Sequence, residues 1–287
     1  MIKIDLQDKD DFLQNHYDAL SKKMAKSFPK SSIYSIEEII KATPKELQEI
    51  ANWFTNLKDA KKEQFDYIVT LYKNFTSKKK EYDAYDLADK LSVDVCPYCN
   101  RNYTFTIKDK DSKCTRPDFD HFYDKKSYPI LALSFYNLIP SCRVCNSGLK
   151  GSTPFTLQTH LHPYKDSFNE YAKFFFKVKD SSFYYSEKGF NIKLNTDDCR
   201  TKNIINDFAL EILYNKHKDI VLELIQKREI YSDSYIDDLF NQYEGTLFKN
   251  REDLLRLITC GYVEDKNLDK RPLSKLIKDI SEELELL

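Results

Sequence analysis

Glycine is scarce in this sequence, at 5 of 287 residues, and long apolar runs are absent. The most apolar stretch, Pro129 to Pro140, contains Ser134 and Asn137 and falls well short of the roughly 20 residues of a membrane-spanning helix. Neither common glycine-rich phosphate-binding loop can be found. We therefore expect a soluble protein, with no membrane association, that does not hydrolyse ATP itself.

The N-terminal residues do not contain the apolar block followed by small residues that a secretory signal requires. No internal repeat, linker or low-complexity tract interrupts the chain. The composition, 41% hydrophobic and 32% charged with 20 Tyr and 19 Phe, is too aromatic for a disordered chain. These features predict a globular, cytoplasmic protein.

Positive charge is concentrated in the middle of the chain. The whole sequence has a formal net charge of −1, yet residues 96–151 carry 9 Lys and Arg against 5 Asp. Residues 1–95 and 152–287 are net negative. The central segment is therefore the place where an anionic partner such as nucleic acid would bind.

Five of the seven cysteines lie in the same segment, and an odd total excludes a fully paired disulfide set. Two Cys-x-x-Cys pairs in a reducing compartment are typical of a tetrahedral zinc site with a structural role. The alternative is one redox dithiol plus two core cysteines. Cys114 is either a fifth thiol near the site or, as we prefer, a loop or core cysteine. The predicted zinc ligands are Cys96, Cys99, Cys142 and Cys145.

Helical patterns flank this segment and predict a mainly α, α+β fold. Ser35 and Thr43 each begin a capping box, and apolar residues then recur at helical spacing. Alternating residues around Gly189 predict a small sheet of two or three strands. The regions expected are an N-terminal helical region, a central core with the zinc site, and a small sheet followed by C-terminal helices: 1–92, 93–165 and 166–287.

The segment from the first cysteine pair to the residues just after the second contains the residue types that metal-assisted phosphodiester hydrolysis needs. Asp120 offers a carboxylate for a hard cation, His121 a base for water, and the asparagines Asn137 and Asn146 side-chain amide oxygens. Asp120 and His121 are adjacent in an expected strand, so their side chains leave on opposite faces unless the strand bends or ends there. Asp118 lies on the face of Asp120 and is a weaker candidate ligand.

The order Cys-x-x-Cys, Asp-His, Asn, Cys-x-x-Cys-Asn resembles the HNH endonucleases, whose ββα-metal core binds one divalent ion. The resemblance implies that His121 is the general base and that Asn137 holds the loop and orients the His121 backbone. It makes Asp120 and Asn146 the ligands of Mg²⁺ or Mn²⁺. Asn146 replaces the last His of the signature, which favours Mg²⁺ over a soft metal. Lys150, one turn later, is placed at the scissile phosphate.

The sequence segments around the motif are more specific than the motif itself. Cys96-Pro-Tyr-Cys-Asn-Arg-Asn-Tyr103, Tyr128-Pro-Ile-Leu-Ala-Leu-Ser134 and Asn137-Leu-Ile-Pro-Ser-Cys142 look similar to the PtuB-type HNH proteins of Septu antiphage systems, some of which accompany retrons. Later fragments, Leu213 to His217 and Arg271 to Ile280, look similar too. The resemblance implies an effector nuclease whose partner is a PtuA-like ABC/SMC ATPase, with a retron RNA or DNA complex as a further partner.

Two other functions remain open at this point. A zinc-stabilised nucleic-acid-binding module without catalysis explains the cysteines and the positive segment, but leaves Asp120, His121 and Asn146 as coincidences. An interaction protein with a decayed core is the other. The motif does not choose between DNA, RNA and tRNA as substrate. His160 and His162 alternate as in a strand, and are expected to pack rather than to contact substrate.

Overall fold

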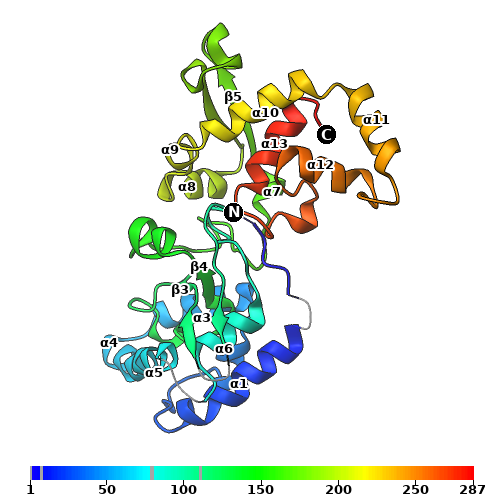
Figure 1. The fold of residues 1–287 in the computed structure, drawn as a ribbon. Coiled ribbons are helices and arrows are strands. Elements are labelled where there is room, and N and C mark those ends of the chain that lie inside the picture. The colour runs from blue at the N-terminus through cyan, green and yellow to red at the C-terminus, as the bar shows by residue number, and fades with distance from the viewer. Residues whose placement is uncertain (1, 7–8, 78–80, 110–111) are drawn as a thin grey trace. The chain divides into compact units, whose positions relative to one another are not determined.

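The computed structural model describes residues 2–6, 9–77, 81–109 and 112–287. They fall into two compact units (Figure 1). The core unit consists of residues 3–98 and 104–166, and the C-terminal unit of Ile2, residues 99–103 and residues 167–287. The boundaries of the three regions proposed from the sequence stay a prediction.

Helices form the first part of the core unit. The two predicted capping boxes are present, with the side chains of Ser35 and Thr43 accepting from the backbone N–H groups of Glu38 and Glu46. The helices in the core unit are α1 (Lys9–Ala25), α2 (Ile36–Lys41), α3 (Pro44–Thr55), α4 (Asp59–Lys62), the 3-10 turn η1 (Glu63–Phe65), α5 (Asp66–Thr76) and α6 (Ala84–Leu91).

Helix α1 was not predicted from the sequence. Its buried stripe runs through His16, Leu20 and Met24, one residue from each turn. A histidine at the first of these positions breaks the apolar pattern by which an amphipathic helix is recognised. Both nitrogens of the buried His16 ring form hydrogen bonds, with the Tyr82 hydroxyl and with the backbone oxygen of Leu133.

A two-stranded antiparallel sheet lies at the centre of the core unit. Strand β3 (Asp118–His121) pairs with β4 (Leu138–Ser141), and His121 stands opposite Leu138. The π-helix η4 (Val144–Lys150) follows β4 directly. The connection between the strands contains the 3-10 turns η2 (Pro129–Leu131) and η3 (Phe135–Asn137), and a second, short sheet pairs β1 (Ile107–Lys108) with β2 (Lys113–Thr115).

The N-terminal helices support the connection between β3 and β4. Helices α2 and α3 contact both η2 and η3, and α5 contacts η2. The Tyr72 hydroxyl of α5 donates to the backbone oxygen of Phe119 in β3 at 3.2 Å. A two-stranded sheet is at best marginally stable in water, so these contacts supply what the sheet lacks.

The C-terminal unit combines one hairpin with helices. Strands β5 (Lys173–Val178) and β6 (Phe190–Asn195) pair antiparallel, as predicted, and the turn before β6 is built from η5 (Ser181–Tyr184) and η6 (Glu187–Gly189). Helix α13 packs on β5. The helical elements are α7 (Phe168–Tyr171), α8 (Cys199–Asp207), α9 (Leu210–Tyr214), α10 (Lys218–Ile230), α11 (Asp233–Tyr243), α12 (Arg251–Thr259), η7 (Asp265–Asn267) and α13 (Ser274–Glu283).

Two local predictions need correction. His160 and His162 were expected to alternate along a strand, but they lie in a loop of turns. Apolar residues from Ile212 to Ile225 recur at helical spacing and predict one helical segment, but the structure divides this segment into α9 and α10. Among the described residues, no helix combines the length and apolar character needed to cross a membrane.

Candidate functional site

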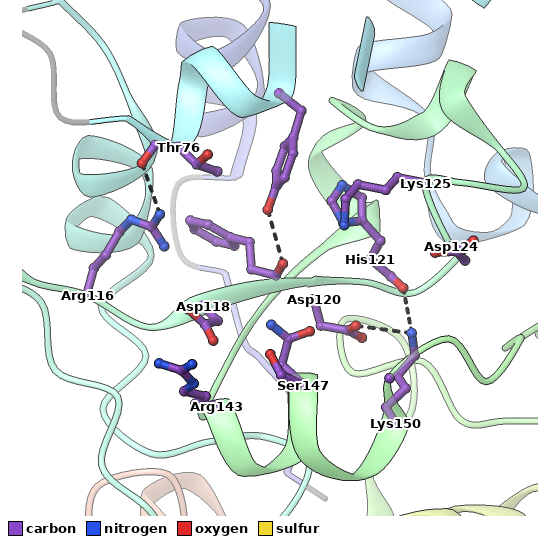
Figure 2. A pocket seen from close by; sticks show the side chains of 14 residues that line it. Thr76, Arg116, Asp118, Asp120, His121, Asp124, Lys125, Arg143, Ser147 and Lys150 are labelled. Carbon is purple, nitrogen blue, oxygen red and sulfur yellow. Dashed lines mark hydrogen bonds and ion pairs between the residues drawn. The ribbon is translucent and has the colours of Figure 1, made fainter. Parts of the chain in front are cut away.

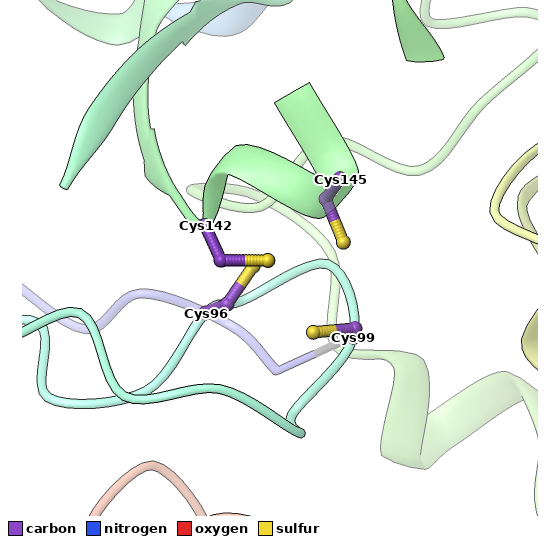
Figure 3. Close-up of side chains that lie close together, drawn as sticks. All are labelled: Cys96, Cys99, Cys142 and Cys145. Atoms are coloured by element: carbon purple, nitrogen blue, oxygen red, sulfur yellow. The ribbon is translucent and has the colours of Figure 1, made fainter. Parts of the chain in front are cut away.

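Four cysteine thiols gather at one point of the structure. Cys96 and Cys99 come from the turn after α6, and Cys142 and Cys145 from the end of β4 and the start of η4. All four are buried, and their Sγ atoms lie within 4.8 Å of one another. Figure 3 shows the four side chains pointing toward a common centre.

This cluster fits a tetrahedral zinc ion. Zn–S bonds of about 2.3 Å place the four sulfurs about 3.8 Å apart, so a small contraction brings the thiols into coordination distance. The backbone N–H of Arg101 donates to Cys99 Sγ at 3.4 Å, a contact that favours a thiolate. The cysteines are free thiols, and Cys114 is exposed beside Ser112 rather than part of the cluster. The four predicted ligands could therefore hold zinc.

A polar cleft of about 400 Å³ opens beside the last residues of β3. Asp120 and His121 both line it, and His121 is the last residue of β3. Asn146 of η4 lines the same cleft. The structure thus brings together the predicted base and both predicted ligands of the catalytic metal, while Asn137 lies outside the lining.

His121 is held in one tautomer. Its ring is buried, and its Nε2 lies 3.0 Å from the backbone oxygen of Ala132. A carbonyl oxygen can only accept, so Nε2 carries the hydrogen and Nδ1 keeps its lone pair. The pKa of His121 is lowered to about 3, mainly by burial and further by the nearby charges of Lys125 and Lys150. The ring is therefore neutral. A neutral ring with a free lone pair can accept a proton.

Three successive backbone oxygens of the β3–β4 connection accept hydrogen bonds from three side chains. Asn137 Nδ2 donates to Leu131 O at 2.9 Å, His121 Nε2 to Ala132 O at 3.0 Å, and His16 Nε2 to Leu133 O at 3.0 Å. The loop that orients His121 is thus held on both sides.

Asn137 also ties this loop to the chain just after His121. Its Oδ1 accepts from Tyr123 N at 2.7 Å, and its Nδ2 donates to Tyr123 O at 3.1 Å. The backbone oxygen of Asn137 accepts from Phe122 N at 3.1 Å. The side chain is fully buried, and these hydrogen bonds of its amide are all to backbone atoms. These contacts are the ones that a residue holding the loop requires.

Asp120 is buried between two donors. The Tyr98 hydroxyl donates to Oδ2 at 2.7 Å, and Lys150 Nζ lies 3.1 Å from Oδ1. Burial raises the pKa of Asp120, whereas the charge of Lys150 and the Tyr98 hydrogen bond lower it. Tyr98 stands between Cys96 and Cys99, so the cysteine turn itself positions the carboxylate.

Lys150 is not solvated as a lysine at a helix end usually is. Its side chain is buried, and Nζ donates to His121 O at 2.8 Å as well as to Asp120 (Figure 2). It also lies over the Phe155 ring, 4.8 Å from the centroid. Its assignment to the substrate phosphate stays a prediction.

Asp118, the weaker candidate ligand, also lines the cleft. Four further charged residues of the lining were not singled out from the sequence: Arg116, Asp124, Lys125 and Arg143. Single lysines and arginines in a charged segment carry no positional signal, so only the excess charge of residues 96–151 indicated them. His160 and His162 are buried but do not line the cleft: His160 stacks on Phe155 and His162 packs on Phe122.

Two curated proteins share part of this sequence. The Septu protein PtuB of Bacillus thuringiensis is 31% identical over 86 residues, which are 30% of this chain and 30% of that protein. Protein ea31 of Escherichia phage lambda is 35% identical over 77 residues, 26% of this chain and 22% of that protein. The chain thus matches less than a third of either relative's length. No family model and no solved structure matches it.

Proposed function

We propose that this chain is a metal-dependent endonuclease with an HNH, ββα-metal core, and that it serves as the effector nuclease of a bacterial antiphage system. One observation carries the proposal. A neutral histidine, a buried carboxylate and an amide line one cleft, at the end of a two-stranded sheet that is followed by a helical turn. A binding module without catalysis has no need of this combination.

The residues divide the reaction among them. His121 accepts a proton at Nδ1 from the attacking water, while Ala132 O holds the ring through Nε2. Asn137 holds the loop that carries Ala132. In the metal-free structure, Tyr98 and Lys150 hold the carboxylate of Asp120.

Asp120 and Asn146 would hold the catalytic Mg²⁺ or Mn²⁺. Carboxylate and amide oxygens suit a hard cation, and water molecules in the open cleft can complete its coordination. A divalent ion held there would supply positive charge to neutralise the charge that develops on the phosphate and the leaving oxygen. The four cysteines would hold a separate, structural Zn²⁺.

The nucleic-acid backbone is the substrate that the cleft suits. Arg116, Lys125 and Arg143 add positive charge around the carboxylates. Lys125 and Arg143 are at least partly exposed, so they can reach phosphates on either side of the scissile one. Lys150 remains our candidate for the scissile phosphate itself. Both DNA and RNA, including tRNA, carry the backbone that this arrangement recognises.

The defence role is supported by the partial likeness to PtuB. We propose a PtuA-like ABC/SMC ATPase as partner, with a retron complex as a further one, in the cytoplasm. The absence of a glycine-rich phosphate loop from the sequence agrees with an ATPase on another chain.

The test is Mg²⁺-dependent cleavage of plasmid DNA and of total tRNA by the purified chain. His121→Ala should abolish cleavage and keep the zinc content. His160→Ala is the matched control, because this buried histidine lies outside the cleft, and it should cut like the wild type. Equal cleavage by wild type and His121→Ala would overturn the assignment of the base.

Binding without cleavage would favour the alternative, a zinc-stabilised nucleic-acid-binding module. The assay is therefore repeated with the ATPase partner, because an effector subunit can be silent alone. Cleavage that appears only with the partner and disappears in His121→Ala supports the effector function. Tight binding with no cleavage under either condition supports the module.

A further inference from the structure

One of the lysines that line the cleft, Lys150, is almost completely buried. Lys150 is 2% exposed, and its ammonium contacts Asp120 Oδ1, His121 O and the Phe155 ring. An unpaired ammonium at this depth would be strongly unfavourable, and these partners compensate for its burial.

The carboxylate of Asp120 depends on the same contact. It is 3% exposed, and it receives one neutral donor, the Tyr98 hydroxyl, and one cation, Lys150. Among the described residues, Lys150 is the one cation that forms an ion pair with Asp120, and the charge of Lys125 acts on the carboxylate without such a pair. Without Lys150, the buried carboxylate would have no ion-pair partner until another cation bound.

We propose that Lys150 is an internal counter-ion that occupies the metal-binding carboxylate of Asp120 in the metal-free protein and leaves it when a divalent cation binds. The inference rests on the proposed function, because it takes Asp120 as a ligand of that cation. It deepens the proposal by making metal binding an exchange of one cation for another.

Electrostatic repulsion gives the reason for the exchange. An ammonium 3.1 Å from Oδ1 lies within a few ångströms of any cation that coordinates the same carboxylate. Like charges at such separations repel strongly in a partly buried site. Lysine has a flexible four-carbon stem, so its ammonium can move into the cleft that Lys150 itself lines.

The exchange also places a cation where substrate binds. Once released from Asp120, the ammonium of Lys150 lies in a cleft with phosphate-binding character and can contact the scissile phosphate. The same residue would thus serve the carboxylate before the metal is bound and the substrate afterwards.

The first experiment measures Mn²⁺ affinity by calorimetry in wild type, Lys150→Met, Lys150→Arg and Lys125→Met. Removing the competing charge should tighten Mn²⁺ binding by about tenfold or more in Lys150→Met. Lys150→Arg keeps the charge and should not gain affinity. Lys125→Met removes a cation of the same cleft that makes no ion pair with Asp120, so its gain should be clearly smaller.

The second experiment uses the wild-type chain and does not depend on the folding of a variant. Lys150 is acetylated with an amine-selective reagent, and its modification is followed by peptide mass spectrometry with and without Mn²⁺. Mn²⁺ should increase the modification of Lys150 in the wild type. In Asp120→Asn, where the ion pair is missing, Mn²⁺ should have no such effect.

The outcomes separate the two proposals. Wild-type Mn²⁺ binding that Asp120→Asn abolishes, together with unchanged affinity in Lys150→Met and unchanged labelling, would overturn the counter-ion role and leave the metal site intact. Absence of any Asp120-dependent Mn²⁺ binding in the wild type would overturn the metal site and, with it, this inference.

Discussion

The hydrogen bond from Tyr98 to Asp120 connects the cysteine turn to the candidate active site, and its removal tests that connection. Tyr98 is fully buried, and its hydroxyl lies 2.7 Å from Asp120 Oδ2. Tyr98→Phe keeps the ring and its packing but takes away one oxygen. The substitution therefore isolates the hydrogen bond from the hydrophobic contribution.

The expected cost follows from the charge of the acceptor. A hydrogen bond to an ionised group contributes about 1.5–3 kcal/mol, against about 0.5–1.5 kcal/mol between neutral groups. Tyr164→Phe is the matched control, because the Tyr164 hydroxyl is also buried and donates at 3.0 Å to a neutral acceptor, Leu138 O. We expect Tyr98→Phe to lower the free energy of unfolding by about 2 kcal/mol and Tyr164→Phe by about 1 kcal/mol.

Urea unfolding followed by the fluorescence of Trp53 measures both costs. Trp53 is the one tryptophan in the sequence and lies in α3 of the core unit, so its signal reports that unit. In an Asp120→Asn background, the cost of Tyr98→Phe should fall to the neutral value, a coupling of about 1 kcal/mol. Equal costs for the two tyrosine substitutions, with no coupling to Asp120, would refute the reasoning.

Two further predictions concern zinc and acid. Cys142→Ser should lose zinc and unfold the core unit, since structural zinc contributes to the folding free energy. Cys114→Ser is the control, because Cys114 is exposed and its substitution should leave the zinc content unchanged. A folded, zinc-loaded Cys142→Ser protein would contradict the zinc assignment. Burial lowers the pKa of His16 from 6.5 to about 4, so the unfolded chain binds its proton first as pH falls. His16 should therefore cost about 2–3 kcal/mol of stability between about pH 7.5 and 4.5, a loss that is missing in His16→Gln and is read from urea unfolding at each pH.

Local signals in the sequence were sufficient for several elements. The capping boxes at Ser35 and Thr43 could be predicted because the partner of each cap lies only three residues later in the sequence. The cysteine cluster was predictable for a similar reason, since a Cys-x-x-Cys turn brings two thiols together locally. Two such turns supply the four thiols of one tetrahedral site.

Long-range partners could not be predicted. His16 bonds to Leu133 O, which lies 117 positions away, and no spacing rule relates the two. Tyr98 was read as part of the cysteine motif, but its bond to Asp120 depends on how the turn packs on β3. The sequence placed Lys150 at the scissile phosphate, and it does not show that the last residue of η4 is buried against Asp120.

The candidate site is small, and its rigidity comes from elements outside it. A two-stranded sheet and one helical turn bury too little apolar surface to fix a histidine and a carboxylate by themselves. The cysteine turn holds Asp120 through Tyr98, and helix α1 holds the loop of Ala132 through His16. Catalytic geometry tolerates only small displacements, so a substitution at either support should lower activity without touching substrate. The N-terminal helices therefore belong to the machinery of the site, although they contain none of its proposed chemistry.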